Sequence, residues 1–472
     1  MNQKETSLKR NFLLSLAAQV ISLSISLLLT LLVPKCIDEY QYAYWQTFVL
    51  YIGYVGGFHF GLLDGIVLRY SQFDYEDLDK PRIRSQFQVL LFSISIIALI
   101  FCMIGFETSD SNVRITIILI SVGIITKQLT GYNSYMFQIT NRINQYAKLI
   151  FIQRIVYGLF VIAFLLFHLH AFCWFCIAEL LGDSIGFMMT AKYNKKLYLG
   201  KSLTIKETFR EWKKNVSVGV ILMLANWSSM LIVGGAKMFV QWNWDALTFG
   251  KFSFSFSISN LFLTFVTAIS VVLFPALKRM DVSQLPDLYK KIRSYVSVLL
   301  FAALLLYFPM VWMLELYLPK YVQSMVYLGI LLPMIIYSSR ISLLTNNYLK
   351  AYRKECQMFM INIVSIVGAV ICYALGAYVF KSIDVILLSV VVVTMIKSIL
   401  SEQYVSKEIG YRFTREYMTE LILVVAFILF AAKLSLLTGF LCYSVMILLY
   451  CLMNRDVLIR MVKEVSRNRI NN

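Results

Sequence analysis

Apolar runs of about 20 residues recur along the whole 472-residue chain, separated by short polar or Gly- and Pro-containing breaks. An α-helix needs a run of this length to cross the hydrocarbon core of a bilayer. Hydrophobic residues make up 59% of the chain and charged residues 15%, against roughly 45–50% and about 25% in soluble globular proteins. The excess is too large for one buried core. The chain is therefore predicted to be a polytopic membrane protein, which excludes a soluble enzyme, a nucleic-acid-binding domain and a disordered chain.

The apolar runs divide into fourteen predicted transmembrane helices. The first follows a basic head and continues to Pro34 with no small-residue cleavage site, so we expect a retained span rather than a signal peptide. The predicted spans are 11–34, 43–66, 86–105, 113–137, 146–167, 171–190, 215–239, 248–275, 294–316, 322–347, 356–379, 383–404, 418–435 and 437–453.

The positions of the basic residues test this division. If both termini and the even-numbered connections lie on one side, that side holds about three quarters of the 44 Lys and Arg. The other side carries aromatic residues instead, among them Trp45, Trp242 and Trp244. Because basic loops remain in the cytoplasm and Trp and Tyr favour the membrane interface, the pattern predicts fourteen spans with both termini in the cytoplasm.

The densest basic segment, 192–214, follows six predicted spans and precedes eight more. We therefore expect an all-α fold with an N-terminal six-helix bundle at 1–191, a cytoplasmic linker at 192–214 and a second six-helix bundle at 215–410. An additional transmembrane hairpin is expected at 411–454, and a basic cytoplasmic tail at 455–472. We expect the two bundles to form a V around a central cavity.

Several kinds of chemistry are disfavoured by the residues that carry it. No predicted outer loop exceeds about ten residues or pairs carboxylates with His, so we do not expect a glycan-transferring enzyme. No repeated pore loop or charge ring suggests a channel. Cys173 and Cys176 form a C-x-x-C outside any βαβ context, and His59, His168 and His170 lack the spacing of a zinc site. No metal and no cofactor is expected.

Ionisable residues inside the predicted spans need an explanation, because each costs about 2.5–3.5 kcal/mol at the bilayer centre. In the first half, Glu179 and Asp183 lie one helical turn apart and therefore share a face. Either they form a coupling site, or they pair with Lys127 or Arg154 of neighbouring spans and lock the first bundle. Arg154 could also extend to the cytoplasmic interface.

Two further groups of polar residues also lie within or at the ends of spans. Asp64 lies near the inner end of the second span, where Arg69 is close enough in sequence to pair with it. Asn226, Trp227 and Asn260 could hydrogen-bond sugar hydroxyls, with the indole stacking on a sugar ring. The alternative for these uncharged residues is hydrogen bonding between helices.

The second half contains three buried cations, Lys251, Arg340 and Lys397, and the sequence suggests no acidic residue as their partner. We expect a substrate phosphate to supply the negative charge, because Arg binds phosphate oxygens in a bidentate manner and Lys supplies a point charge. Alternatively, each cation hydrogen-bonds backbone carbonyls or reaches an interface. The serine alternation in 251–260 has the period of a strand, but a lone strand in lipid leaves its backbone unsatisfied, so we predict a helix.

Three short motifs carry a resemblance to a known family: GLLDGIVLRY at 61–70, FQITNRINQYA at 137–147 and LFPALKR at 273–279. With them the chain resembles the polysaccharide transporters, which include O-antigen and other lipid-linked oligosaccharide flippases, of the multidrug/oligosaccharidyl-lipid/polysaccharide (MOP) superfamily. The resemblance covers spans one to twelve. The two extra C-terminal spans resemble those of lipid II flippases, where such a pair helps to hold the polyprenyl tail, although the first span here lacks the arginines of those flippases.

This resemblance implies alternating-access transfer of a polyprenyl-diphosphate-linked oligosaccharide, such as an O-antigen, capsule or exopolysaccharide repeat unit. It implies a bacterial cytoplasmic (inner) membrane protein that contacts membrane lipids and works beside the glycan polymerase or glycosyltransferases of its pathway, without nucleic acid. The alternative is a cation-coupled multidrug exporter of the same superfamily, for which acids would have to line the cavity.

Overall fold

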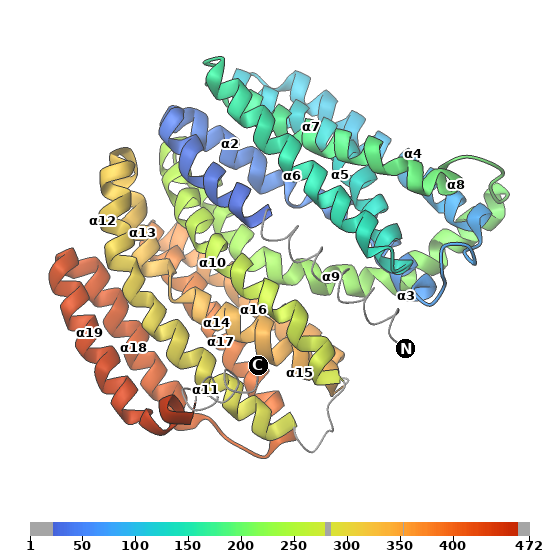
Figure 1. Cartoon of the computed structure of the whole chain (residues 1–472). Helices are drawn as coiled ribbons and strands as arrows, with labels where there is room; N and C mark the ends of the chain where they lie inside the picture. Colours follow the sequence, from blue (N-terminus) through green and yellow to red (C-terminus); the bar gives the residue numbers. More distant parts are fainter. Residues whose placement is uncertain (1–21, 279–284, 353, 461–472) are drawn as a thin grey trace. The chain divides into compact units, whose positions relative to one another are not determined.

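The computed structural model describes residues 22–278, 285–352 and 354–460 (Figure 1). The described residues contain helices and no strand, which confirms the all-α prediction. Every predicted span overlaps a helix in this part of the chain. Eight of the described helices are long and apolar enough to cross a membrane, or ten when each of two bent helix pairs counts as one span. The chain is therefore a multi-pass membrane protein.

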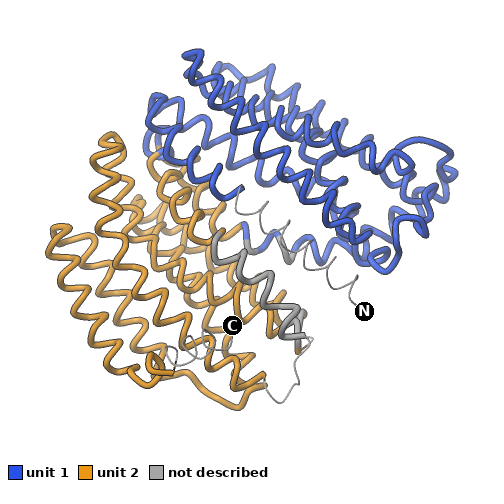
Figure 2. The backbone as a smooth tube through the Cα atoms, in the orientation of Figure 1, with its two compact units in different colours: residues 1–230, 245–250 blue, residues 231–244, 251–472 orange. Residues whose placement is uncertain are grey.

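The chain forms two compact units, coloured separately in Figure 2. Unit 1 comprises residues 1–230 and 245–250, and unit 2 comprises residues 231–244 and 251–472. The chain passes from one unit to the other inside α9 (Ile205–Asn243), directly after α9 and again near the start of α10 (Ala246–Lys278), and not at the predicted linker 192–214.

Unit 1 is built from helices that pack against their neighbours in the sequence, with α4 against α5 and α6 against α7. The elements are a helix at Ser22–Cys36, α2 (Glu39–Ile52), the 3₁₀ helix η1 (Val55–His59), α3 (Leu62–Tyr70), α4 (Lys80–Glu107), α5 (Ser111–Ile139), α6 (Ile143–Leu166), α7 (Phe172–Ala191), η2 (Lys192–Asn194), α8 (Lys195–Tyr198) and the first part of α9.

Unit 2 contains the rest of α9 and the C-terminal helices, and α18 packs against both α13 and α19. The elements are α10 (Ala246–Lys278), α11 (Leu285–Ala303), η4 (Leu304–Leu306), α12 (Tyr307–Tyr317), η5 (Pro319–Tyr321), α13 (Val322–Leu331), α14 (Met334–Arg340), the π-helix η6 (Ile341–Thr345), α15 (Asn346–Ala351), α16 (Glu355–Ala374), the π-helix η7 (Leu375–Val379), α17 (Ile383–Ile409), α18 (Thr414–Lys433) and α19 (Leu436–Met453).

Aspartates mark the starts of several helices in unit 1. The Asp38 carboxylate accepts a hydrogen bond from the backbone N–H of Tyr40, and that of Asp110 accepts from Asn112 and Val113. A carboxylate at this position satisfies N–H groups that have no partner within the helix and interacts favourably with the helix dipole. Short polar breaks therefore suffice to end one span and start the next.

The second predicted span is bent by 54° between η1 and α3. The bend lies at Phe60 and Gly61, whose φ angles of 51° and 82° are left-handed. A Cβ at Gly61 would lie 2.5 Å from the backbone nitrogen of Val220 in α9. Gly61 therefore permits both the turn and the close approach of α9.

The serine-rich stretch 251–260 is helical, as predicted, and forms part of α10. Ser257 donates to the carbonyl of Ser253, one turn earlier, at 3.0 Å. Ser255 donates to the carbonyl of Ser324 in α13 at 2.8 Å. The hydroxyls of Ser255 and Ser257 are thus satisfied by backbone carbonyls of the same or a neighbouring helix, which is how serine is accommodated in a membrane span.

The predicted linker 192–214 is folded onto unit 1. The guanidinium of Arg84 in α4 donates to the carbonyls of Lys196 and Lys201, and that of Arg142 donates to the carbonyl of Tyr193. Gly200 has a φ of 126° beside Arg84, where a Cβ would lie 2.8 Å from the guanidinium carbon. The basic segment therefore belongs structurally to unit 1.

Candidate functional site

Three helices of unit 1 bring ionisable side chains to one place. Lys127 comes from the middle of α5, Arg154 from α6, and Glu179 and Asp183 from α7. The i, i+4 spacing places the two carboxylates on the same face of α7, which packs against both α5 and α6. We call this set the unit-1 cluster.

Lys127 pairs with both acids of the unit-1 cluster. Its Nζ lies 2.6 Å from Glu179 Oε1 and 2.9 Å from Asp183 Oδ2. Asp183 also accepts a hydrogen bond of 2.7 Å from the side-chain amide of Gln153 on α6. The sequence suggested Lys127 or Arg154 as the partner of these carboxylates, and the structure shows that both carboxylates pair with Lys127.

The unit-1 cluster lines a pocket of about 200 Å³. The side chain of Lys127 remains 28% exposed and that of Glu179 17% exposed, so the cluster is neither sealed nor fully solvated. Arg154 lies in the pocket wall. The remaining wall is polar or aromatic and is formed by Thr130, Gly131, Ser134, Gln153 and Tyr157.

Two cations and two carboxylates give the unit-1 cluster no formal net charge. A proton or cation that binds a carboxylate competes with Lys127, and an anion that enters the pocket competes for Lys127 and Arg154. Either event changes the ion pairs that join α5 to α7. A ligand that binds one conformation of a protein more tightly than another shifts the equilibrium toward the first conformation. Such an exchange of ion pairs can therefore shift a conformational equilibrium.

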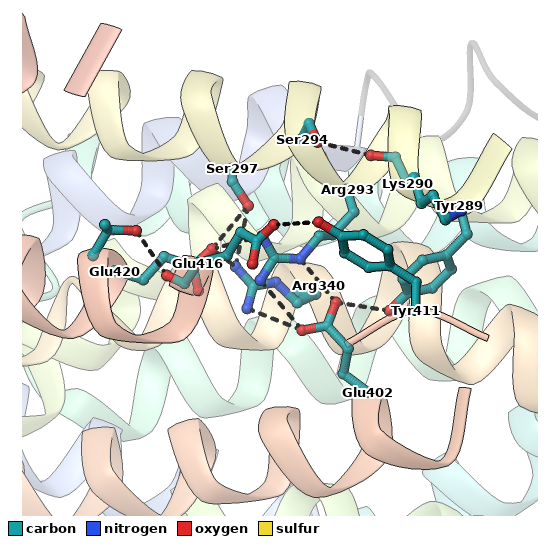
Figure 3. Close-up of polar contacts among 11 residues, drawn as sticks. Tyr289, Lys290, Arg293, Ser294, Ser297, Arg340, Glu402, Tyr411, Glu416 and Glu420 are labelled. Carbon is teal, nitrogen blue, oxygen red and sulfur yellow. Dashed lines mark hydrogen bonds and ion pairs between the residues drawn. The ribbon is translucent and has the colours of Figure 1, made fainter. Parts of the chain in front are cut away.

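A second charged group lies in unit 2 (Figure 3), and Arg340 is the one member that the sequence indicated as a site residue. Arg293 of α11 and Arg340 of α14 lie between Glu402 of α17 and Glu420 of α18. The distances are 3.0 Å from Arg293 to Glu402, 3.2 Å from Arg293 to Glu420, 3.6 Å from Arg340 to Glu402 and 2.7 Å from Arg340 to Glu420. We call these four residues the unit-2 network.

The unit-2 network is closed to solvent, with every side chain at most 2% exposed. Tyr289 donates to Glu402 at 2.9 Å, and Ser297 bridges Glu420 and Arg340 at 3.3 and 3.1 Å. These contacts satisfy charges that would otherwise be costly to bury. They also connect α18 of the C-terminal hairpin to three helices of the second bundle.

The expectation that Arg340 lacks an acidic partner is wrong, because two glutamates neutralise it. Glu402 and Glu420 lie inside the predicted spans 383–404 and 418–435, so a complete census of acids in spans would have found them. Arg293 directly precedes a predicted span and was assigned to a cytoplasmic connection. Lys251 is half-buried on α10 and Lys397 is 5% exposed on α17.

The expected pair of Asp64 with Arg69 is also wrong. The guanidinium of Arg69 pairs with Glu211 at 2.5 Å and with the side-chain oxygen of Asn215, both on α9. Asp64 lies 3.6 Å from Nε2 of the buried His59. Arg69 and its partners on α9 are more than 140 positions apart in the sequence, so nothing near Arg69 in the sequence indicates this pairing.

The expected sugar contacts lie on α9 and α10. In unit 1, the Trp227 indole packs against Gly57, where a Cβ would lie 1.6 Å from a ring carbon, and its ring centroid is 6.0 Å from that of Tyr54. Asn260 is exposed on α10, and the side chain of Asn226 lies outside the described residues. Within the described residues there is no group of three or more His, Cys, Asp or Glu that could hold a metal ion.

No protein-family model matches the sequence, and no curated protein matches it significantly. The structure is similar to the lipid II flippase MurJ in its inward closed conformation, with a TM-score of 0.65 at 13% identity over 94% of this chain and 99% of that chain. It is also similar to an inward-facing multidrug resistance MATE family transporter of the MOP superfamily, with a TM-score of 0.60 at 12% identity over 83% of this chain and 98% of that chain. The chain has the MOP superfamily fold.

The MOP fold is the architecture that the resemblance of the sequence motifs to this superfamily implied. A third structure with this fold, a point mutant of the Vibrio cholerae MATE transporter VcmN, matches with a TM-score of 0.55 at 12% identity over 85% of this chain and 97% of that chain. The named structures that share the fold are transporters. The polysaccharide-transporter subfamily stays a prediction.

Proposed function

We propose that the chain is a flippase that translocates a polyprenyl-diphosphate-linked oligosaccharide, such as an O-antigen, capsule or exopolysaccharide repeat unit, by alternating access. The observation that carries this proposal is the extent of the fold match. The lipid II flippase covers 94% of this chain, whereas the two MATE transporters cover 83% and 85%. A MATE-like fold accounts for less of the chain than a flippase fold does.

The C-terminal hairpin of α18 and α19 supports the same choice. Its outward side chains include Leu441, Val445 and Leu448, each more than half exposed. In a bilayer such a surface faces acyl chains, and a polyprenyl tail is another long apolar chain. The hairpin therefore offers a surface along which the lipid part of the substrate can remain in the membrane.

The polar part of the substrate needs cations. We propose that Lys251 and Lys397 contact the diphosphate and that Asn226, Trp227 and Asn260 contact sugars, while Arg340 is left out because its charge is used in the unit-2 network. Lys127 and Arg154 are left out as well, because Lys127 is paired with Glu179 and Asp183 and the unit-1 cluster has no formal net charge.

We further propose that the protein lies in the bacterial cytoplasmic membrane with both termini inside, beside the glycosyltransferases or polymerase of its pathway. Cys36, at the end of the first described helix, would then face outward. A membrane-impermeant maleimide should label Cys36 in intact cells when the other cysteines are replaced. Labelling of a cysteine introduced at Lys201 in intact cells would contradict this orientation.

A cation-coupled multidrug exporter is the second candidate. The observation in its favour is that Glu179 and Asp183 lie in a solvent-reachable pocket, where a carboxylate can bind a proton or a metal cation. The difficulty is that Lys127 already neutralises both of them. An organic cation would have to compete with an ammonium group 2.6–2.9 Å from the carboxylates.

Reconstitution distinguishes the two functions. Proteoliposomes that contain a polyprenyl-diphosphate-linked oligosaccharide are treated with a membrane-impermeant enzyme that modifies the glycan. A flippase should make the whole glycan pool accessible, whereas protein-free vesicles expose only the outer leaflet. Ethidium uptake, driven by a pH or Na⁺ gradient in parallel vesicles, measures the exporter activity, and uptake without glycan translocation would overturn the proposal.

Matched variants then test the diphosphate contacts. Lys251→Gln and Lys397→Gln should each lower the translocation rate by about tenfold, the ratio that corresponds to roughly 1.4 kcal/mol. Lys433→Gln, at an exposed position at the end of α18, is the control and should keep the full rate. Full rates in both test variants would show that these lysines do not contact the substrate.

A further inference from the structure

A second pocket, with a volume of about 430 Å³, lies within unit 2 and is separate from both charged groups described above. This size is within the range of pockets that hold small molecules. Its lining side chains come from the end of α9, from α13 and from the start of α17; they are Trp244, Gln323, Val326, Tyr327, Lys381, Ser382, Ile383 and Asp384.

The pocket lies where the α9–α10 and α16–α17 connections meet the start of α13. The charge pattern of the sequence places the connections that flank these residues on the side of the membrane that carries few basic residues. Their meeting at one pocket is compatible with that pattern, because connections on opposite sides cannot meet. On this topology the pocket opens at the outer face.

The loop from α16 to α17 has an unusual backbone. Lys381 adopts a φ of 48°, a left-handed conformation that side-chain-bearing residues rarely take. Two hydrogen bonds hold it, from Phe380 N–H to the carbonyl of Leu375 at 2.9 Å and from Ser382 N–H to the carbonyl of Gly376 at 3.0 Å. These bonds form a helix C-cap, which fixes the backbone of Lys381 and Ser382 at the pocket.

The pocket combines an aromatic surface with a balanced set of polar groups. Trp244 and Tyr327 supply rings, and the Gln323 side-chain amide donates to the Tyr327 hydroxyl at 2.8 Å, which fixes the amide's orientation. Lys381 and Asp384 add one donor group and one acceptor group of opposite charge. An amide adds a further acceptor in its carbonyl oxygen.

These groups match a sugar better than other ligands. A pyranose ring presents C–H groups that pack on an aromatic face and hydroxyls that both donate and accept hydrogen bonds. A phosphate would be repelled by the Asp384 carboxylate, and a metal cation would be repelled by the Lys381 ammonium group. We propose that this pocket binds sugar rings of the glycan at the outer face, and we call it the outer sugar site.

The outer sugar site rests on the proposed function for its biological role, because a flippase releases its glycan on the outer side. A weak site there would hold the sugar after the diphosphate has crossed and would disfavour its return. Every lining residue belongs to unit 2, so the site is built within one unit.

Saturation-transfer-difference NMR on the purified full-length protein in detergent tests the site directly. The probes are galactose, N-acetylglucosamine and lactose at millimolar concentration. We expect transfer to the ring C–H protons of at least one of them, and we expect Trp244→Ala to reduce that transfer by about tenfold. Trp242→Ala is the control, because Trp242 is 60% exposed, lies two residues away and does not line the pocket.

A second variant guards against a folding defect. Gln323 is exposed, so Gln323→Ala should leave the unfolding temperature unchanged while it weakens the transfer signal. Equal signals in wild type, Trp244→Ala and Gln323→Ala, or no signal with any probe, would overturn the outer sugar site. Sugar binding by a protein that translocates no lipid-linked glycan would overturn the proposed function and leave the site standing.

Discussion

Each unit contains one cluster of two cations and two carboxylates, and the two clusters differ in how far they are buried. In unit 1 the side chains of Lys127 and Glu179 are 28% and 17% exposed and line a pocket. In unit 2 the side chains of Arg293, Arg340 and both glutamates are at most 2% exposed. The same formal charge therefore occurs once in a form that solvent can reach and once in a closed form.

The comparison shows that burial determines which role a charged cluster can play. A closed network cannot exchange an ion or a substrate group without opening, and losing one partner leaves a buried charge uncompensated. An open cluster is stabilised less by its pairing, because water competes for each charge. We therefore interpret the unit-2 network as the support of the C-terminal hairpin and the unit-1 cluster as the group that responds to ligands.

Breaking the closed network should have the largest effect. Glu420→Gln leaves Arg293 and Arg340 with only Glu402, and should lower the free energy of unfolding by about 3–5 kcal/mol. Thermal unfolding of the purified protein in detergent measures this. Glu416→Gln, one turn earlier on α18 and bonded only to the surface residue Tyr411, is the control. Equal unfolding temperatures in the two variants would contradict a structural role.

Thiol labelling should sharpen the difference in exposure. In a background without cysteines, Ser134→Cys lies in the wall of the unit-1 pocket and Ser297→Cys lies within the unit-2 network. We expect the cysteine at position 297 to react on the order of a hundredfold more slowly with a small maleimide, because a buried thiol reacts only after local opening. Similar labelling rates would show that the unit-2 network is not closed.

Removing the acids of the open cluster should affect transport more than stability. The double variant Glu179→Gln, Asp183→Asn should lose about 1–2 kcal/mol of unfolding free energy, between the values for exposed and buried pairs. Its transport rate should fall and should no longer depend on pH. Vesicle assays at several pH values measure this rate. A variant that fails to accumulate, or that transports normally, would favour the alternative in which the acids only lock the bundle.

The smallest effect is expected at Glu211, in the predicted cytoplasmic segment before the seventh span. Burial raises the pKa of this carboxyl group, but the hydrogen bond from Tyr70 and the pairing with Arg69 lower it by more, so its net pKa is below the usual range. The depressed pKa means that its stabilisation is complete at neutral pH and is lost as the pH falls below the usual glutamate value toward the folded-state pKa.

Glu211→Gln should therefore cost up to about 1 kcal/mol at neutral pH. The difference in unfolding temperature between wild type and variant should shrink as the pH is lowered to about 4. Thermal unfolding across this pH range gives the comparison. A difference that stays constant with pH would mean that the carboxylate charge contributes nothing.

The helices were predictable because each one depends on local sequence. Every predicted span overlaps a helix in the described residues, and the helical assignment of 251–260 is correct despite its strand-like alternation. The linker 192–214 was predicted from its charge, but its attachment to unit 1 through Arg84 and Arg142 was not. Those two arginines donate to backbone carbonyls, and any residue type can supply a carbonyl.

The site was predictable only in part. The i, i+4 spacing of Glu179 and Asp183 indicated a shared face, and Lys127 was among the partners considered. Arg340 was misassigned because its partners, Glu402 and Glu420, are 62 and 80 positions away in the sequence. Nothing in the flanking residues of Arg340 indicates which helix lies beside it.

The sequence by itself determined that this protein is an all-helical, multi-pass membrane protein, because in lipid each apolar segment must satisfy its backbone hydrogen bonds within itself. Only the tertiary structure decided which charges are neutralised and which face a pocket. The physical reason is range: a helical hydrogen bond joins residues four positions apart, whereas an ion pair at 2.7 Å between Arg340 and Glu420 exists only after α14 and α18 have packed together.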